Sequence, residues 1–160
     1  MKINYKNRWD SIQSILGERD AFVSALPGNT RYLANSESPP GSPPSSTMNY
    51  VIIPKKGDPV AITSSLEEHR CRHESSVKDI RCWSTYPDIE SEGKNSLDVL
   101  KSTLSDIKAK KIFADSKIRL GRSFGVSVNA KISELRSIKS PEEISRIRTV
   151  SYTHLRAHET

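Results

Sequence analysis

The feature that most constrains the fold is a pair of short apolar runs joined by a polar turn. The runs cover residues 50–54 (YVIIP) and 59–63 (PVAIT), and the turn between them is KKGD at 55–58. Both runs are rich in β-branched residues, and the Gly-Asp pair in the turn favours a tight hairpin. The segment therefore predicts two antiparallel strands.

Helix and strand patterns alternate on both sides of this hairpin. Trp9, Ile12, Ile15 and Leu16 recur at helical spacing and predict a helix over about residues 7–18. The other predicted elements are a strand at 21–26 closed by a turn at 27–29, a helix from a capping box at 65–68 to about residue 75, a strand at 80–84, an amphipathic helix marked by Leu97, Leu100, Leu104 and Ile107, and a strand at 111–115. This order predicts an α/β domain with a mixed five-stranded sheet and helices on both faces.

Residues 36–47 read SESPPGSPPSST and fit neither a helix nor a strand. Their prolines lack amide donors and their serines compete for backbone hydrogen bonds. Because a predicted strand follows at once, we expect an exposed loop rather than a linker between domains.

A strong signal for the start of a helix lies near residue 140. Ser140 can cap this helix, Pro141 suits a first turn that needs no amide donor, and Glu143 can complete a capping box. Ile144 and Ile147 then share one apolar face, and few residues follow. We expect this helix to open a further domain.

Composition narrows the classes of function. The 160 residues suffice for one domain with its own core, and the net charge of +6 is scattered rather than gathered into a patch, so we expect no specific nucleic-acid partner. Cys71 and Cys82 make no disulfide framework, and no run is long and apolar enough for a signal sequence or a membrane span. A cytoplasmic protein without a membrane partner is the expectation.

Three segments together resemble a known family. They are NTRYLANS at 29–36, YVIIPKKGDPVAITSSLEEHRC at 50–71 and ELRSIKSPEEISRIR at 134–148. Their sequences, and the order in which they occur, resemble the N-terminal domain of the creatinase, prolidase and aminopeptidase P family of metallopeptidases. The resemblance implies a ribonuclease H-like three-layer fold.

The resemblance also implies a division of the chain. Residues 1–138 would form the N-terminal domain, and residues 139–149 would begin a linker helix to a catalytic domain beyond Arg148. That domain would hold two divalent metal ions (Mn, Co or Zn) on two Asp, one His and two Glu ligands, whereas this chain would hold no cofactor. Residues 150–160 depart from the family pattern, and we interpret them as a non-native tail of translated cloning or adapter sequence. The segment between the last predicted strand and Glu134 is also shorter than usual in the family.

Asn29, Arg31 and Tyr32 are the candidate site residues that the resemblance suggests. In the family, the matching loops help to form a homodimer and reach over the active site of the neighbouring subunit, where they contact a proline-containing peptide. The alternative is structural: Asn29 makes a turn, Tyr32 packs on the sheet and Arg31 is solvated.

Other candidate sites have a structural interpretation that we prefer. His69 and His73 could share a helix face with zinc, but Cys71 would point elsewhere and Cys82 is the only further ligand nearby, so we interpret them as a solvated face. His154 and His158 repeat that spacing in the suspected tail. Asp115 at a strand end reads as a cap or turn residue, and the segment GRSFG at 121–125, with Ser123, lacks both a phosphate loop pattern and a base.

Three functions follow. The leading hypothesis is a non-catalytic domain for dimerisation and substrate gating in a Xaa-Pro metallopeptidase. The second is a protein-interaction module of a catalytically dead, histone-chaperone-like relative. The third is the N-terminal domain of a creatinase-type amidinohydrolase.

Overall fold

The computed structural model describes residues 3–35, 50–116, 126–128 and 131–158. The predicted loop at 36–47 lies outside this set. In chain order the elements are α1 (Tyr5–Ile15), β1 (Asp20–Ser24), α2 (Pro27–Ala34), β2 (Tyr50–Pro54), β3 (Val60–Ser64), the 3-10 turn η1 (Ser65–Glu67), α3 (Glu68–Glu74), β4 (Asp79–Trp83), α4 (Ser96–Asp106), β5 (Lys111–Ala114), β6 (Val126–Val128), α6 (Lys131–Ser137) and α7 (Pro141–His158).

The sheet is mixed, as predicted, and its strand order is β4-β3-β2-β1-β5-β6. The hairpin pairs β2 with β3 in antiparallel register, and Gly57 in its turn has a φ of 95°, a conformation that glycine adopts without strain. β1 is antiparallel to β2, whereas β1·β5, β3·β4 and β5·β6 are parallel. The prediction of five strands was one short, because β6 has only three residues, too few for a recognisable strand pattern.

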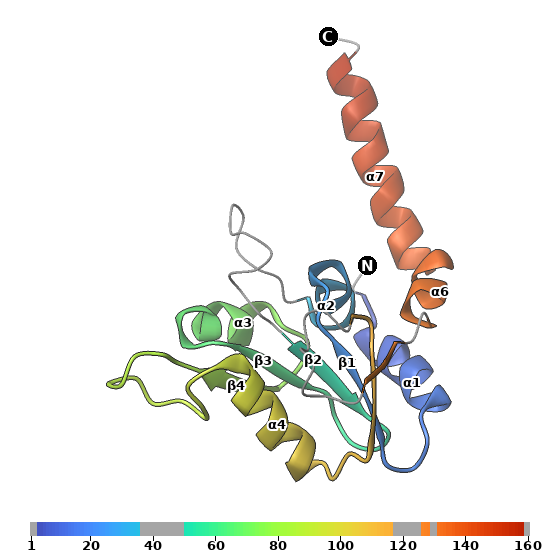
Figure 1. Ribbon diagram of the computed structural model, residues 1–160. Helices are drawn as coiled ribbons and strands as arrows, with labels where there is room; N and C mark the ends of the chain where they lie inside the picture. Colours follow the sequence, from blue (N-terminus) through green and yellow to red (C-terminus); the bar gives the residue numbers. More distant parts are fainter. Residues whose placement is uncertain (1–2, 36–49, 117–125, 129–130, 159–160) are drawn as a thin grey trace.

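Helices cover both faces of the sheet, which confirms the predicted three-layer α/β class (Figure 1). Successive strand residues alternate between two apolar clusters: Phe22 and Ile53 belong to one face, Val23 and Ile52 to the other. The first face packs against α1, α2, α3 and α6, and the second packs against α4. The buried alternation fixes the register of each strand.

Local capping signals set where two helices begin. The predicted capping box of α7 is present: the Ser140 backbone amide donates to Glu143 Oε2 at 2.9 Å, and the Glu143 amide donates to Ser140 Oγ at 3.3 Å. At the helix predicted from residue 65 the cap is one residue earlier, since Ser64 Oγ accepts from the Leu66 amide. A 3-10 turn then leads into α3.

The predicted turn at 27–29 was wrong, because these residues begin helix α2. Pro27 stands in its first turn, where its fixed φ suits a helix and its missing amide donor costs nothing. Asn35 ends the helix in the left-handed conformation, with a φ of 56°. Residues 29 to 33 are therefore helical: Asn29, Thr30 and Leu33 are buried, whereas Arg31 is exposed.

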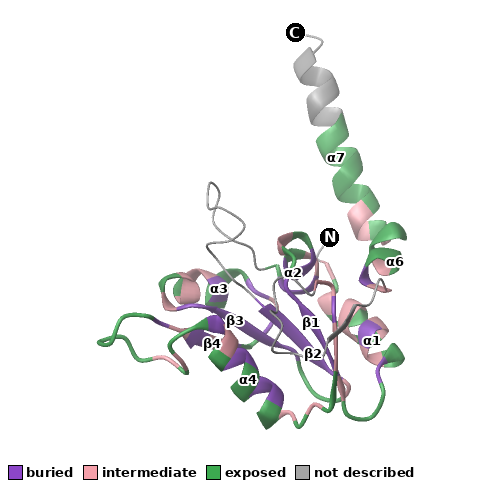
Figure 2. Cartoon of the chain, viewed as in Figure 1, coloured by how far each residue is buried: buried purple, intermediate pink, exposed green. Residues whose placement is uncertain are grey.

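Helix α7 leaves the rest of the domain (Figure 1). Its side chains from Ile144 to Ser151 are exposed, as the unbroken green stretch in Figure 2 shows. Its backbone stays helical through His158, past the predicted boundary at residue 150.

Candidate functional site

The carboxylate of Asp115 organises the junction of β1, β5 and α2. It follows β5 directly and accepts hydrogen bonds from Ser24 Oγ at 2.8 Å, the Ala25 amide at 2.9 Å, the Leu26 amide at 3.3 Å and Asn29 Nδ2 at 2.8 Å. The carboxylate thus lies at the start of α2, where amide donors and the helix dipole favour an anion. Asp115 therefore holds the turn that leads from β1 into α2, although it caps none of the amides of α2 itself.

Asn29 connects this hydrogen-bond network to α6. Its side chain is nearly buried, with 5% exposed; Nδ2 donates to Asp115, and Oδ1 accepts from Arg136 Nη1 at 2.6 Å. Both ends of the Asn29 amide are therefore engaged within the chain. Asn29 joins β5, α2 and α6 into one unit.

Tyr32 lies one turn further along α2, between two guanidinium groups. The Arg8 guanidinium carbon is 3.8 Å from the ring centroid, and that of Arg136 is 5.8 Å away. Both distances fit cation–π contacts, which are stronger when partly shielded from water. Burial raises the pKa of the Tyr32 hydroxyl above its ordinary value, against the opposing influence of the Arg8 cation.

Arg8 connects α1 with the first turn of α7. One Nη donates to the backbone carbonyl of Tyr32, and Nη2 forms an ion pair with Glu143 Oε1 at 3.1 Å. The two side chains are 10% and 20% exposed. Because the pair is largely shielded, salt screens it less than a pair on the surface.

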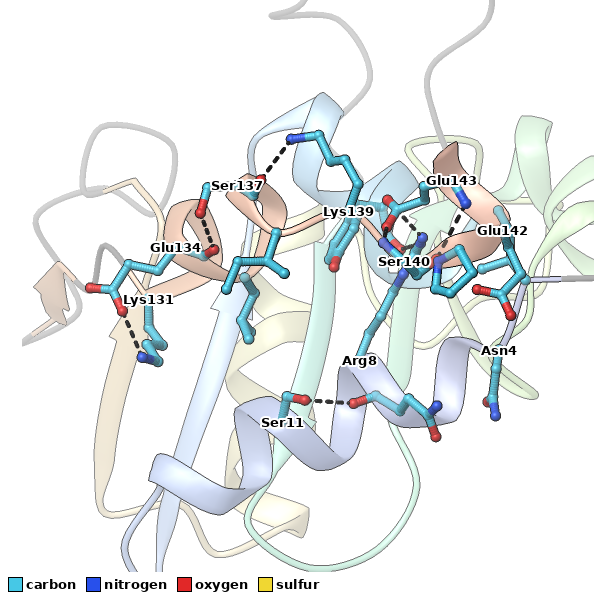
Figure 3. A pocket seen from close by; sticks show the side chains of 16 residues that line it. Asn4, Arg8, Ser11, Lys131, Glu134, Ser137, Lys139, Ser140, Glu142 and Glu143 are labelled. Atoms are coloured by element: carbon cyan, nitrogen blue, oxygen red, sulfur yellow. Dashed lines mark hydrogen bonds and ion pairs between the residues drawn. The ribbon is translucent and has the colours of Figure 1, made fainter. Parts of the chain in front are cut away.

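A pocket of about 560 Å³ lies between the start of α1 and the junction of α6 and α7 (Figure 3). Arg8 rises from α1 toward Glu143 at one side of it, and the Lys131–Glu134 ion pair lies at the opposite side. Both charges and apolar groups contribute to its walls, which are formed by Ile3, Asn4, Asn7, Arg8, Ser11, Tyr32, Lys131, Glu134, Leu135, Ser137, Ile138, Lys139, Ser140, Pro141, Glu142 and Glu143.

The three predicted site residues occupy different environments on α2. Asn29 and Tyr32 belong to the network just described, whereas Arg31 lies on the exposed side of the helix. Sequence reasoning missed Arg8 and Arg136 as their partners. No local pattern could have identified Arg136, because 107 residues separate it from Asn29.

The histidine and cysteine candidates do not assemble a metal site in the described part of the chain. His69 and His73 are exposed, with ring centroids 4.6 Å apart, whereas Cys71 is buried beside Thr63. Over the described residues, no group of three or more His, Cys, Asp or Glu side chains could hold a metal ion. The 121–125 segment and the side chains of His154 and His158 lie outside the described set.

Cys82 is a buried thiol on β4. Burial raises its pKa to about 12, and the nearby carboxylates of Glu68 and Glu92 add to the rise. A thiol protonated to such high pH is a poor nucleophile.

None of the helices in the described part of the chain has the length and apolar character needed to cross a membrane.

Comparison with known proteins gives a match at the level of structure. No protein-family model and no curated protein matches the chain. A prolidase from Thermococcus sibiricus superposes with a TM-score of 0.66 at 19% identity, covering 91% of this chain and 40% of that one. A Xaa-Pro dipeptidase from Bacillus anthracis gives 0.65 at 15% identity, covering 97% and 44%.

A solved single domain matches over almost its full length. The creatinase/prolidase N-terminal domain of an X-Pro dipeptidase from Streptococcus pyogenes gives a TM-score of 0.57 at 18% identity, covering 82% of this chain and 98% of that one. The chain spans less than half the length of the prolidase and the Xaa-Pro dipeptidase. These matches confirm the expected fold, that of a creatinase/prolidase N-terminal domain.

Proposed function

We propose that this chain, with the fold of a creatinase/prolidase N-terminal domain, serves as the non-catalytic N-terminal domain of a Xaa-Pro metallopeptidase. The observation that carries the proposal is the match to an isolated domain of this kind over 98% of its length. Residues 1–138 would be the domain, residues 139–149 the start of the linker helix, and residues 150–160 a non-native tail. The catalytic domain, with two divalent metal ions, would follow the linker.

We also propose that the domain contributes to a homodimer and gates the peptide substrate. α2 suits this role because its inner side is fixed and its outer side is accessible. Asn29 is bonded to Asp115 and to Arg136, and Trp9 Nε1 donates to the Leu33 carbonyl at 2.7 Å, so the helix is held from two directions. A rigid element presents a side chain more reproducibly than a loop does.

Of the three candidate residues, Arg31 is the best placed for substrate contact. Its side chain is exposed, and a guanidinium can hold a carboxylate with two parallel hydrogen bonds. Asn29 and Tyr32 would then act mainly by holding α2, with contact to substrate limited to the part of Tyr32 that is exposed. The peptide carboxylate is the group that this arrangement recognises.

The experiment compares Arg31→Ala with Lys6→Ala in the two-domain protein. Loss of a charge-assisted contact costs about 1.5–3 kcal/mol, which corresponds to a fall of roughly 10- to 150-fold in kcat/KM for a Xaa-Pro dipeptide. Lys6 is the matched control, because it is an exposed cation on α1. Since the contact is made in trans, mixing the Arg31 variant with a catalytic-domain variant should restore part of the activity. Unchanged kinetics would contradict the gating role.

The 160-residue chain alone should hydrolyse no Xaa-Pro peptide when Mn²⁺, Co²⁺ or Zn²⁺ is added. The reason is that the ligands of a two-metal site would lie in the following domain. A metal-dependent peptidase activity that copurifies with the isolated chain would contradict the proposal that this chain is non-catalytic.

A further inference from the structure

Helix α7 is attached to the domain only at its first turn, as far as the described side chains extend. Glu142 and Glu143 are half-buried, whereas every side chain from Ile144 to Ser151 is exposed. The helix nevertheless has a definite direction, standing away from the sheet beyond α6 (Figure 1). Among the described side chains of this segment, those of residues 140–143 are therefore the ones that can set that direction.

Glu143 is the residue of that turn with the most contacts across the joint. Its Oε2 accepts from the Ser140 amide at 2.9 Å and so closes the capping box. Its Oε1 pairs with Arg8 Nη2 at 3.1 Å. One carboxylate therefore fixes the start of α7 and ties it to α1.

Arg8 is itself held in place by α2 and by a neighbouring side chain of its own helix, α1. It donates to the backbone carbonyl of Tyr32 on α2, and its guanidinium lies 3.8 Å from the Tyr32 ring and 5.0 Å from the Tyr5 ring. A planar guanidinium held by a carbonyl and two rings can present its remaining nitrogen in one direction only. Arg8 is thus a rigid anchor rather than a flexible surface cation.

The segment before α7 gives the helix little other support. Residues 138 and 139 are exposed between α6 and the Ser140 cap. α6 is fixed from below, since Ile132 is buried and Arg136 is bonded to Asn29. The short connection between two helices is therefore the place at which α7 could pivot.

We infer that Arg8 is a clamp that sets the direction in which α7 leaves the domain, acting through Glu143. This inference goes beyond the proposed function and does not depend on it, since it concerns the geometry of this chain alone. In the two-domain protein, the clamp would determine how the N-terminal domain is oriented on whatever follows α7. Arg8 is a positioning residue in this sense.

The test measures the direction of α7 with pulsed electron paramagnetic resonance on the 160-residue chain. Nitroxide labels are attached to Lys101→Cys on α4 and Ser151→Cys on α7, both exposed positions, in a Cys71→Ala, Cys82→Ala background. Arg8→Met keeps the length of the side chain and removes its charge. Glu143→Gln keeps an oxygen for the cap and removes the ion pair.

The clamp predicts a narrow distance distribution in the labelled parent and one about twofold wider in Arg8→Met and in Glu143→Gln, as alternative directions become populated. Arg8→Lys, which keeps the charge without the fork, should give an intermediate width. Lys6→Met on α1 and Glu134→Gln on α6, both at exposed charged side chains outside the clamp, are the matched controls and should leave the width unchanged.

Circular dichroism melts of the same variants show whether the domain remains folded. An unchanged width in both folded Arg8→Met and Glu143→Gln would overturn the inference. Equal broadening in the two controls would overturn it as well, because the direction of α7 would then depend on charge in general rather than on this pair.

Discussion

Helices α4 and α7 begin alike and end in opposite environments. Asn95 caps α4 by accepting from the Leu97 and Asp98 amides, and Ser140 caps α7 in its capping box. Yet Val99 and Leu100 of α4 are fully buried, whereas Ile144, Ile147 and Val150 of α7 are 40%, 53% and 57% exposed (Figure 2). Local sequence determines where a helix begins, and only the rest of the fold determines what covers it.

The contrast shows that one face of α7 exposes apolar side chains. Three apolar side chains at helical spacing form a stripe that nothing in the described structure covers. Most helical stability in proteins comes from packing such a stripe rather than from propensity. Under the proposed function, the following domain would supply the packing that the sheet supplies for α4.

The largest expected effect comes from truncating the same kind of side chain on both helices. Leu100→Ala should lower the free energy of unfolding by about 2–5 kcal/mol, because it leaves a cavity against the sheet. Ile147→Ala should change it by no more than about 0.5 kcal/mol, because an exposed side chain leaves no cavity. Urea titrations followed by circular dichroism measure both. Similar losses of unfolding free energy in the two variants would show that α7 packs against another part of the protein in solution.

The second prediction compares a distant hydrogen-bond acceptor, Asp115, with a local helix cap, Ser140. Asp115→Ala removes a charged acceptor from the Ser24 hydroxyl and from two amides in the turn before α2, and should cost about 1.5–3 kcal/mol of global stability. Ser140→Ala should cost about 1 kcal/mol or less, confined to fraying of α7. Hydrogen exchange separates the two effects, since only the first should speed exchange in β1. The comparison would be contradicted if Ser140→Ala slowed amide exchange in α7, or if Asp115→Ala left amide exchange in β1 unchanged.

The same contrast between local and distant partners explains which parts of the fold could be predicted from the sequence. The hairpin, the capping box at Ser140 and the alternation of helices and strands follow from residues close to one another, and all three are observed. The α2 helix was missed because the carboxylate that holds the turn before it and the Asn29 side chain belongs to Asp115, 86 residues beyond Asn29. Read locally, Pro27 and Gly28 indicate a turn.

The candidate site was less predictable than the fold for the same reason. Asn29, Arg31 and Tyr32 were predicted from a resemblance in sequence, and the capping residues from a local pattern. Arg8 and Arg136 became visible only when the fold placed α1 and α6 beside α2. Lys and Arg are frequent along this chain, so no sequence pattern distinguishes Arg8 and Arg136 from the other basic residues.

The third prediction tests the body of the domain at alkaline pH. The unfolded thiol of Cys82 ionises near its ordinary pKa of 9.0, and the folded thiol near 12, so the folded state keeps its proton while the unfolded state loses it. Stability from this group is complete below pH 9 and falls as pH rises toward 12. The stability difference between the parent chain and Cys82→Ala should therefore shrink by on the order of 1 kcal/mol by pH 10.

The control for this effect is Val77→Ala, which truncates a buried side chain of the same cluster without a titrating group. Its difference from the parent should stay constant between pH 8 and pH 10, as measured by urea titration at each pH. A constant difference for Cys82→Ala as well would show that the thiol is more accessible to water than its burial indicates.

The smallest expected effect is the removal of residues 151–160, the far part of α7 and the end of the chain. Every side chain described from Ile144 to Ser151 is exposed, so this stretch of α7 adds little to the packed core. The deletion should change the free energy of unfolding by no more than about 0.5 kcal/mol, and the melting temperature by about 1–2 °C. Far-UV circular dichroism should show a loss of helix limited to the removed residues and some fraying. A loss of more than about 2 kcal/mol would show that the deleted segment packs on the domain, and α7 would then resemble α4 rather than oppose it.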